Sequence, residues 1–233
     1  MSNELWLIVS FVLFYGGLLI WYKLFGEHGL YAFTVFASII ANIEVLLMVK
    51  AFGMVMTLGN VMFATTFVAT DILSENYGKK NADHAVMIGI AASLTFLFTS
   101  QLWLHFTPAS SDWARPAFDA IFSKTPRVIL ASLVVYAITQ LGDVWMYHRW
   151  WNWTTERFGD SRKFLWLRNN ASTLAAQFVN SLLYTFLAFY GRYDMSTLWS
   201  IAISSYVIFI ATSLLDTPIV YVARWMHERG MAE

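Results

Sequence analysis

Seven apolar runs, each about as long as a lipid bilayer is thick, constrain the fold of this chain more than any other feature. A helix rises about 1.5 Å per residue, so about 20 apolar residues cross the ~30 Å hydrocarbon core of a membrane. The runs cover residues 5–22, 30–49, 54–77, 85–106, 128–148, 169–190 and 198–222. Hydrophobic residues make up 58% of the chain and charged residues only 13%, a balance unlike that of water-soluble proteins. The sequence therefore predicts an all-α integral membrane protein, a bundle of about seven transmembrane helices.

The 233 residues contain no linker, charge run or low-complexity segment, so we expect residues 1–233 to form a single transmembrane domain. The first run has no basic residue before it and no small-residue cleavage pattern after it. This favours a retained N-terminal helix at 5–22 over a cleaved signal peptide.

Basic residues are distributed unequally between alternate loops. Ten lie on the side that includes the C-terminus, and five lie on the other side. Because cytoplasmic loops carry an excess of Lys and Arg, this count predicts a cytoplasmic C-terminus and, with an odd number of helices, an N-terminus outside.

The longest outer loop, residues 107–126, carries Trp113, Ala117, Phe118 and Ile121 at helical spacing. This spacing predicts a short amphipathic helix at the membrane interface. Such a helix either rests on lipid headgroups or forms a lid, and the sequence leaves both open.

Three aspartates lie inside the apolar runs: Asp71, Asp143 and Asp216. Each precedes the basic residue at its helix end by six to eight positions, or roughly 9–12 Å along a helix. The shared depth predicts one polar layer. A carboxylate within a membrane costs roughly 2.5–3.5 kcal/mol and usually has a functional purpose.

Other polar residues fall on the same helices. Asn170, Thr173, Gln177 and Asn180 recur on one face of the run at 169–190, which cannot face lipid. Gln140 shares a face with Asp143, Glu75 shares one with Asp71, and Asn42 lies in the second run. Such groups either form a ligand site or hydrogen-bond between helices. We expect interhelical bonding for Asn42, and for Glu75 either contact with water or a salt bridge with Lys79.

Three aromatic residues, Phe67, Trp145 and Tyr184, fall beside the polar positions or one turn away. They are candidates for stacking on a flat ring, while acceptors such as Asp and Gln suit a ligand with N–H donors. The expected partners are thus a small nucleobase-like molecule and membrane lipid, with no nucleic acid.

Catalytic and metal-binding patterns are missing from the sequence. It has no cysteine, no nucleotide-binding Gly-rich loop and no histidines at metal-ligand spacing. We therefore expect no metal, no cofactor and no catalytic site. A membrane enzyme that uses the carboxylates for acid–base chemistry stays open, as does a purely structural role.

Several blocks of the sequence resemble the queuosine precursor transporter family over about residues 30–221. They are Ala41-Asn42, residues 67–80 (FVATDILSENYGKK), 121–128 (IFSKTPRV) leading to 140–145 (QLGDVW), and 167–174 (LRNNASTL) leading to Gln177.

The resemblance implies uptake of a 7-deazaguanine, the cyano or aminomethyl precursor of queuosine, across a bacterial or archaeal inner membrane. It implies a six-helix core at 30–222, to which the helix at 5–22 is an addition. It singles out Asn42, Asp71, Glu75, Gln140, Asp143, Asn170, Thr173 and Gln177 as site residues. This chain has Asn180 where an acidic residue is expected, which leaves open the exact substrate, including another vitamin or purine, and any proton coupling. A homo-oligomer and a separate energising partner also stay open.

Overall fold

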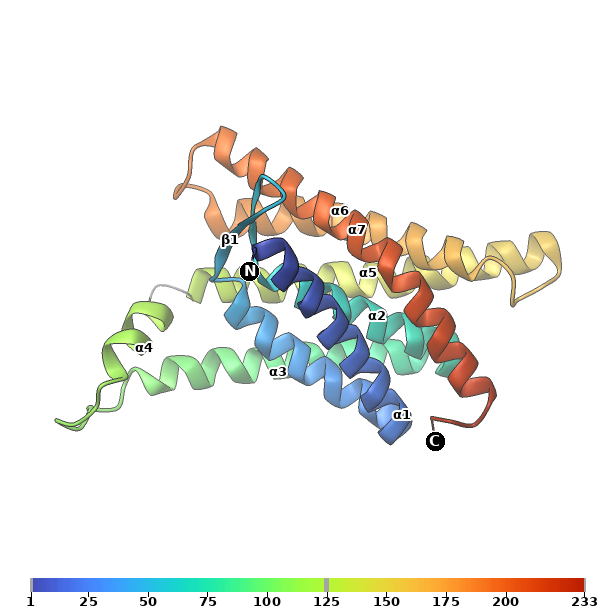
Figure 1. Cartoon of the computed structure of the whole chain (residues 1–233), viewed down its shortest axis with the longest axis horizontal. Helices are drawn as coiled ribbons and strands as arrows, with labels where there is room; N and C mark the ends of the chain where they lie inside the picture. Colours follow the sequence, from blue (N-terminus) through green and yellow to red (C-terminus); the bar gives the residue numbers. More distant parts are fainter. Residues whose placement is uncertain (1, 124–125, 233) are drawn as a thin grey trace.

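The computed structural model describes residues 2–123 and 126–232. These residues form seven helices and one two-stranded antiparallel sheet (Figure 1). In chain order the elements are α1 (Asn3–Glu44), β1 (Met48–Ala51), β2 (Met54–Thr57), α2 (Gly59–Tyr77), α3 (Lys79–Trp103), α4 (Arg115–Phe122), α5 (Pro126–Phe158), α6 (Leu165–Phe189) and α7 (Met195–Glu228). Five of these helices, α1, α3, α5, α6 and α7, are long and apolar enough to cross a membrane. A helical, multi-pass membrane architecture is therefore confirmed.

Helix α1 holds the first two predicted runs as a helical hairpin. Gly26 has φ +56°, a conformation that favours glycine, and the chain reverses there, so the second half of α1 returns beside the first (Figure 1). The two halves approach closely, since a Cβ on Gly29 would lie 2.2 Å from the Trp21 carbonyl oxygen. Glycine at both positions therefore permits the reversal.

The predicted helix boundaries at residues 49 and 54 are wrong. The helix ends at Glu44, and β1 and β2 pair between Met48 and Thr57. The turn residues Phe52 and Gly53 both have positive φ, as tight hairpin turns require. A short apolar run does not distinguish strand from helix by periodicity alone, so the change from helix to strand was not apparent from the sequence.

The bundle has two ends. One carries the sheet, the chain start, α4 and the α6–α7 loop, and we call it the hairpin end (Figure 1). The opposite end carries the Gly26 reversal, Gly78, the 159–164 loop and residue 232, and we call it the basic end. The long helices run between these ends.

Helix α2 lies at the centre of the bundle. Every residue from Gly59 to Ser74 except Phe63 is buried, and α2 packs against α1, α3, α5 and α7. Because other helices surround it, α2 can carry polar side chains that lipid would not tolerate.

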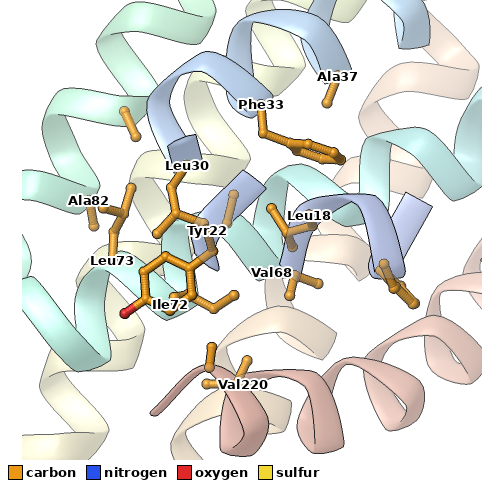
Figure 2. Close-up of a cluster of buried hydrophobic side chains, with 14 of the residues drawn as sticks. Leu18, Tyr22, Leu30, Phe33, Ala37, Val68, Ile72, Leu73, Ala82 and Val220 are labelled. Carbon is orange, nitrogen blue, oxygen red and sulfur yellow. The ribbon is translucent and has the colours of Figure 1, made fainter. Parts of the chain in front are cut away.

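A large apolar cluster holds α1 and α7 against α2. Figure 2 shows Tyr22, Leu30 and Phe33 of α1 beside Ile72 of α2 and Val220 of α7. All five side chains are at most 3% exposed. One face of the N-terminal half of α1, which includes Tyr15, Leu18 and Tyr22, therefore packs into the core.

The predicted interfacial helix exists as α4, but it packs against the end of α3. Phe118 and Phe122 lie with their ring centroids 5.6 and 5.5 Å from that of Trp103. Trp113 precedes the helix and is 89% exposed. The predicted loop also includes residues 124 and 125, which lie outside the described residues.

Candidate functional site

The three aspartates meet in the interior of the bundle. Asp71 on α2, Asp143 on α5 and Asp216 on α7 are each at most 1% exposed. They lie close enough to interact electrostatically with one another. The common depth predicted from the sequence is thus realised as one buried layer, which we call the aspartate layer.

Asp71 and Asp143 are adjacent, and α6 covers them. Thr173 donates a hydrogen bond of 3.3 Å to one oxygen of Asp71. Asp143 lies beside Asp71, Ser172 and Thr173. The second oxygen of Asp71 and both oxygens of Asp143 have no hydrogen-bond partner among the described residues. A buried carboxylate group without partners is unfavourable, so these oxygens are available to a ligand, water or a proton.

Asp216 has a different partner, supplied by the N-terminal half of α1. The Tyr15 hydroxyl donates a hydrogen bond to one Asp216 oxygen, and both side chains are buried. The other oxygen has no partner in the described part of the chain. The N-terminal half of α1 therefore completes the aspartate layer on the α7 side.

Three predicted site residues are used to join helices. Gln140 exchanges hydrogen bonds with Thr66 and Thr70 of α2. Asn170 bonds to Ser213 and Thr217 of α7. Asn42 bonds to Ser93 of α3 and to the backbone of its own helix, as expected for that residue. These amides bond to neighbouring helices in the way that polar residues often do in membranes.

Gln177, Asn180 and Tyr184 behave differently, although they continue the same face of α6. Gln177 is fully buried, and neither atom of its amide group has a partner. The Tyr184 hydroxyl is also unpartnered. Asn180 is 6% exposed and makes no hydrogen bond to the described residues. Three successive side chains on one helix face thus have unused donors and acceptors.

A small cavity of about 30 Å³ lies on the hairpin side of the aspartate layer. This volume is well below that of a formed small-molecule site, about 300–1,000 Å³, so a ligand can enter only when the cavity walls move apart. Its lining comes from five helices: Ala41, Val45, Gly59, Asn60, Phe63, Ser132, Asn180, Tyr184 and Phe209. Through Val45 it adjoins a wider recess at the hairpin end, lined by α4 and the α6–α7 loop.

The aromatic candidates separate in the structure. Phe67 is fully buried and lies 5.5 Å from Phe63 between ring centroids, whereas Tyr184 lines the cavity directly. Trp145 is 60% exposed on the outer face of α5, so it does not reach the layer. Phe63 and Phe209 line the cavity with ring centroids 6.3 Å apart. Sequence reasoning missed both, because one Phe in an apolar helix is indistinguishable from another.

The structure corrects the prediction for Glu75. Lys79 pairs with Asp83 instead, while the Glu75 carboxylate is 4% exposed and binds two guanidinium groups. Its nearest oxygens lie 2.6 Å from Arg168 Nη2 and 3.2 Å from Arg224 Nη1. We call Glu75, Arg168, Arg224 and Tyr147 the ionic cluster, since the Tyr147 hydroxyl also donates to Glu75 over 2.7 Å.

The ionic cluster lies at the basic end of the bundle. It joins α2, α5, α6 and α7, the four helices that border the aspartate layer. The Arg168 side chain is fully buried, and its guanidinium carbon lies 4.2 Å from the centre of the Trp151 ring. The sequence showed these arginines only as basic residues near helix ends. Arg168 and Arg224 follow Glu75 by about 90 and 150 positions in the sequence, so their pairing with Glu75 depends on the tertiary fold.

The described residues thus form a layered interior. A cavity toward the hairpin end is followed along the bundle by unpaired amide and hydroxyl groups, then by unpaired carboxylates, and finally by the ionic cluster. These groups can accept N–H donors and donate to ring acceptors. Within the described ranges, no three His, Asp or Glu residues are grouped to hold a metal ion.

Comparisons with known proteins give matches over most of the chain. A family described as "Putative vitamin uptake transporter" matches residues 57–223. A Bacillus subtilis (strain 168) protein named "Probable queuosine precursor transporter" is 39% identical over 228 residues, which cover 97% of this chain and 96% of the relative. No solved structure matches the chain. The family match begins just before α2 and includes the aspartate layer and, except for Arg224, the ionic cluster.

Proposed function

This chain belongs to the vitamin uptake transporter family, and we propose that it imports a queuosine precursor, 7-cyano- or 7-aminomethyl-7-deazaguanine, into the cytoplasm. The name of the Bacillus subtilis relative supports this substrate class. The observation that carries the proposal is the set of buried, unpaired polar atoms on Asp71, Asp143 and Gln177. A flat heterocycle with N–H donors and ring acceptors would satisfy them.

The proposed orientation has the hairpin end outside and the basic end in the cytoplasm of a bacterial or archaeal inner membrane. The excess of Lys and Arg at the basic end supports this orientation. Seven crossings are proposed, with α1 crossing twice and α2 once. The N-terminus then lies outside, and tags at both ends would test this by their accessibility in intact cells.

The proposed mechanism is alternating access. In this conformation the cavity adjoins the recess at the hairpin end, and the ionic cluster closes the opposite end. Substrate entering from outside would reach Asp71 and Asp143, and release would require the ionic cluster to separate. Because α2, α5, α6 and α7 all contribute to it, separation would move the helices that border the substrate.

The energy source is a separate part of the proposal. An unpaired carboxyl group can take up a proton as well as a substrate N–H, so Asp71 and Asp143 are the candidates for proton coupling. Unchanged concentrative uptake after an uncoupler would exclude that coupling. A chain that acts only as the binding subunit of an ATP-driven complex would instead fail to transport when reconstituted alone.

Ligand binding tests the proposed function directly. A ligand that binds only the folded state at 100 times its Kd raises stability by about 2.7 kcal/mol. We expect 7-deazaguanines to raise the unfolding temperature of the detergent-purified protein, and unrelated vitamins to leave it unchanged. If guanine or a vitamin stabilised the protein and the 7-deazaguanines did not, that ligand class would replace them as the proposed substrate.

A further inference from the structure

The side chains around the small cavity outside the aspartate layer have the features of a separate ligand site. We propose that they form an outer subsite, which opens when the cavity walls separate and in which neutral side chains bind the edge of a planar heterocycle before the ring reaches the carboxylates. The proposal rests on the transport function above and adds a second binding position to it. Asn180 and Tyr184 of α6 line the cavity, as do Phe63 of α2 and Phe209 of α7. The unpartnered Gln177 lies one turn before Asn180, toward the aspartate layer.

Distance along α6 separates the two positions. Asn180 and Tyr184 follow Thr173, which bonds to Asp71, by seven and eleven residues. At about 1.5 Å per residue these intervals are roughly 10 and 16 Å. On α2, Phe63 precedes Asp71 by eight residues, or about 12 Å. A ring held among these cavity residues therefore does not touch the aspartate layer.

Gln177 bridges the two positions. It is four residues from Thr173, about 6 Å along the helix, and both atoms of its amide are free. A primary amide presents a donor and an acceptor side by side, as asparagine and glutamine do when they bind a base edge. Gln177 and Asn180 are thus suited to a lactam or amidine edge, where N–H and acceptor groups alternate.

Helices α2 and α7 supply aromatic contact. The rings of Phe63 and Phe209 are inclined at 53° with centroids 6.3 Å apart, and both border the cavity. Rings at such an angle give a flat ligand one face to stack on and one edge to meet. The ligand class is therefore a planar heterocycle that carries a donor and an acceptor on the same edge.

Interhelical bonding does not account for these groups. Gln140, Asn170 and Asn42 show how structural amides behave in this chain, since each bonds to a neighbouring helix. Gln177 and Asn180 lie in the same bundle at similar burial but have no such partner among the described residues. Unsatisfied buried polar groups call for an explanation, and a transient ligand provides one.

The test combines affinity with cysteine labelling. Asn180→Ala with Tyr184→Phe should raise the Kd for a 7-deazaguanine roughly tenfold, because it removes neutral hydrogen bonds worth about 0.5–1.5 kcal/mol each. The control Tyr206→Phe alters a tyrosine that is absent from the cavity lining and should leave the Kd unchanged. Since the chain has no cysteine, Asn180→Cys gives a single reactive site.

Labelling of Asn180→Cys by a membrane-impermeant thiol reagent from the hairpin side should be slowed by the ligand. It should still be slowed when Asp71 and Asp143 are both changed to Asn, although transport is lost. An unchanged Kd in the cavity variant, or labelling that the ligand does not slow, would overturn the outer subsite while wild-type binding persists. If no heterocycle binds the wild type, the proposed function itself fails, and the subsite fails with it.

Discussion

Removing the Glu75 carboxylate tests whether the ionic cluster holds the basic end closed. In wild type the Arg168 side chain is fully buried and the Glu75 side chain is 4% exposed, so water screens their interaction very little. Glu75→Ala leaves the Arg168 guanidinium buried beside Arg224 with no counter-ion. Breaking a buried ion pair in this way destabilises a protein by about 3–5 kcal/mol.

The assay is equilibrium unfolding of the purified protein in mixed detergent micelles. Asp83→Ala is the matched control, because it breaks the Lys79–Asp83 pair, whose side chains are 45% and 35% exposed. An exposed pair contributes at most about 1 kcal/mol. If Glu75→Ala lowered the unfolding free energy no more than Asp83→Ala does, the reasoning about the ionic cluster would be refuted.

A second readout separates gating from stability. Asn169 is fully buried next to Arg168, so Asn169→Cys should react slowly with a thiol reagent applied from the basic end. Adding Glu75→Gln, which keeps the shape but removes the charge, should speed that reaction. Equal labelling rates with and without Glu75→Gln in folded protein would show that the cluster does not control access.

Three further changes test other parts of the structure. Asp143→Asn should lower uptake strongly at normal protein levels, measured with labelled substrate in cells, since it removes an unpaired carboxylate from the aspartate layer. Tyr15→Phe leaves an Asp216 oxygen without its donor and should reduce the unfolding free energy by about 1–3 kcal/mol; an unchanged value would mean that α1 does not support the layer. Gly89→Ala would place a Cβ 2.1 Å from the Tyr136 hydroxyl oxygen, so thermal unfolding should show a loss of about 1–3 kcal/mol.

Sequence reasoning succeeded where the membrane constrains the chain directly. Lipid requires long apolar helices, so the positions of the helices were predictable from the sequence. The exception is the segment at 48–57, which forms the sheet. A charge within the apolar core needs burial, so the meeting of Asp71, Asp143 and Asp216 was predictable from their common depth. Both results follow from the energetic cost of exposing polar groups to hydrocarbon.

The same reasoning failed where partners come from distant helices. Gln140 and Gln177 look equivalent in the sequence. The amide nitrogen and oxygen of Gln140 each bond to α2, whereas the amide of Gln177 has no partner in the described residues. Lys79 is spaced to pair with Glu75 as its local partner, but Glu75 pairs instead with Arg168, which is fully buried, and with Arg224, which is half-buried. The rotation of each helix about its own axis decides which neighbour a side chain meets, and no local sequence pattern specifies that rotation.

The most direct test of the account is uptake by the purified chain alone in liposomes. With labelled 7-aminomethyl-7-deazaguanine outside, wild-type protein should carry the compound into the lumen, and unlabelled 7-cyano-7-deazaguanine should compete. The Asp143→Asn protein should show no uptake, although it still inserts into the liposomes and gives a normal unfolding transition. Wild-type liposomes that take up no 7-deazaguanine, although the protein in them is folded and inserted, would contradict the claim that this chain is the transporter.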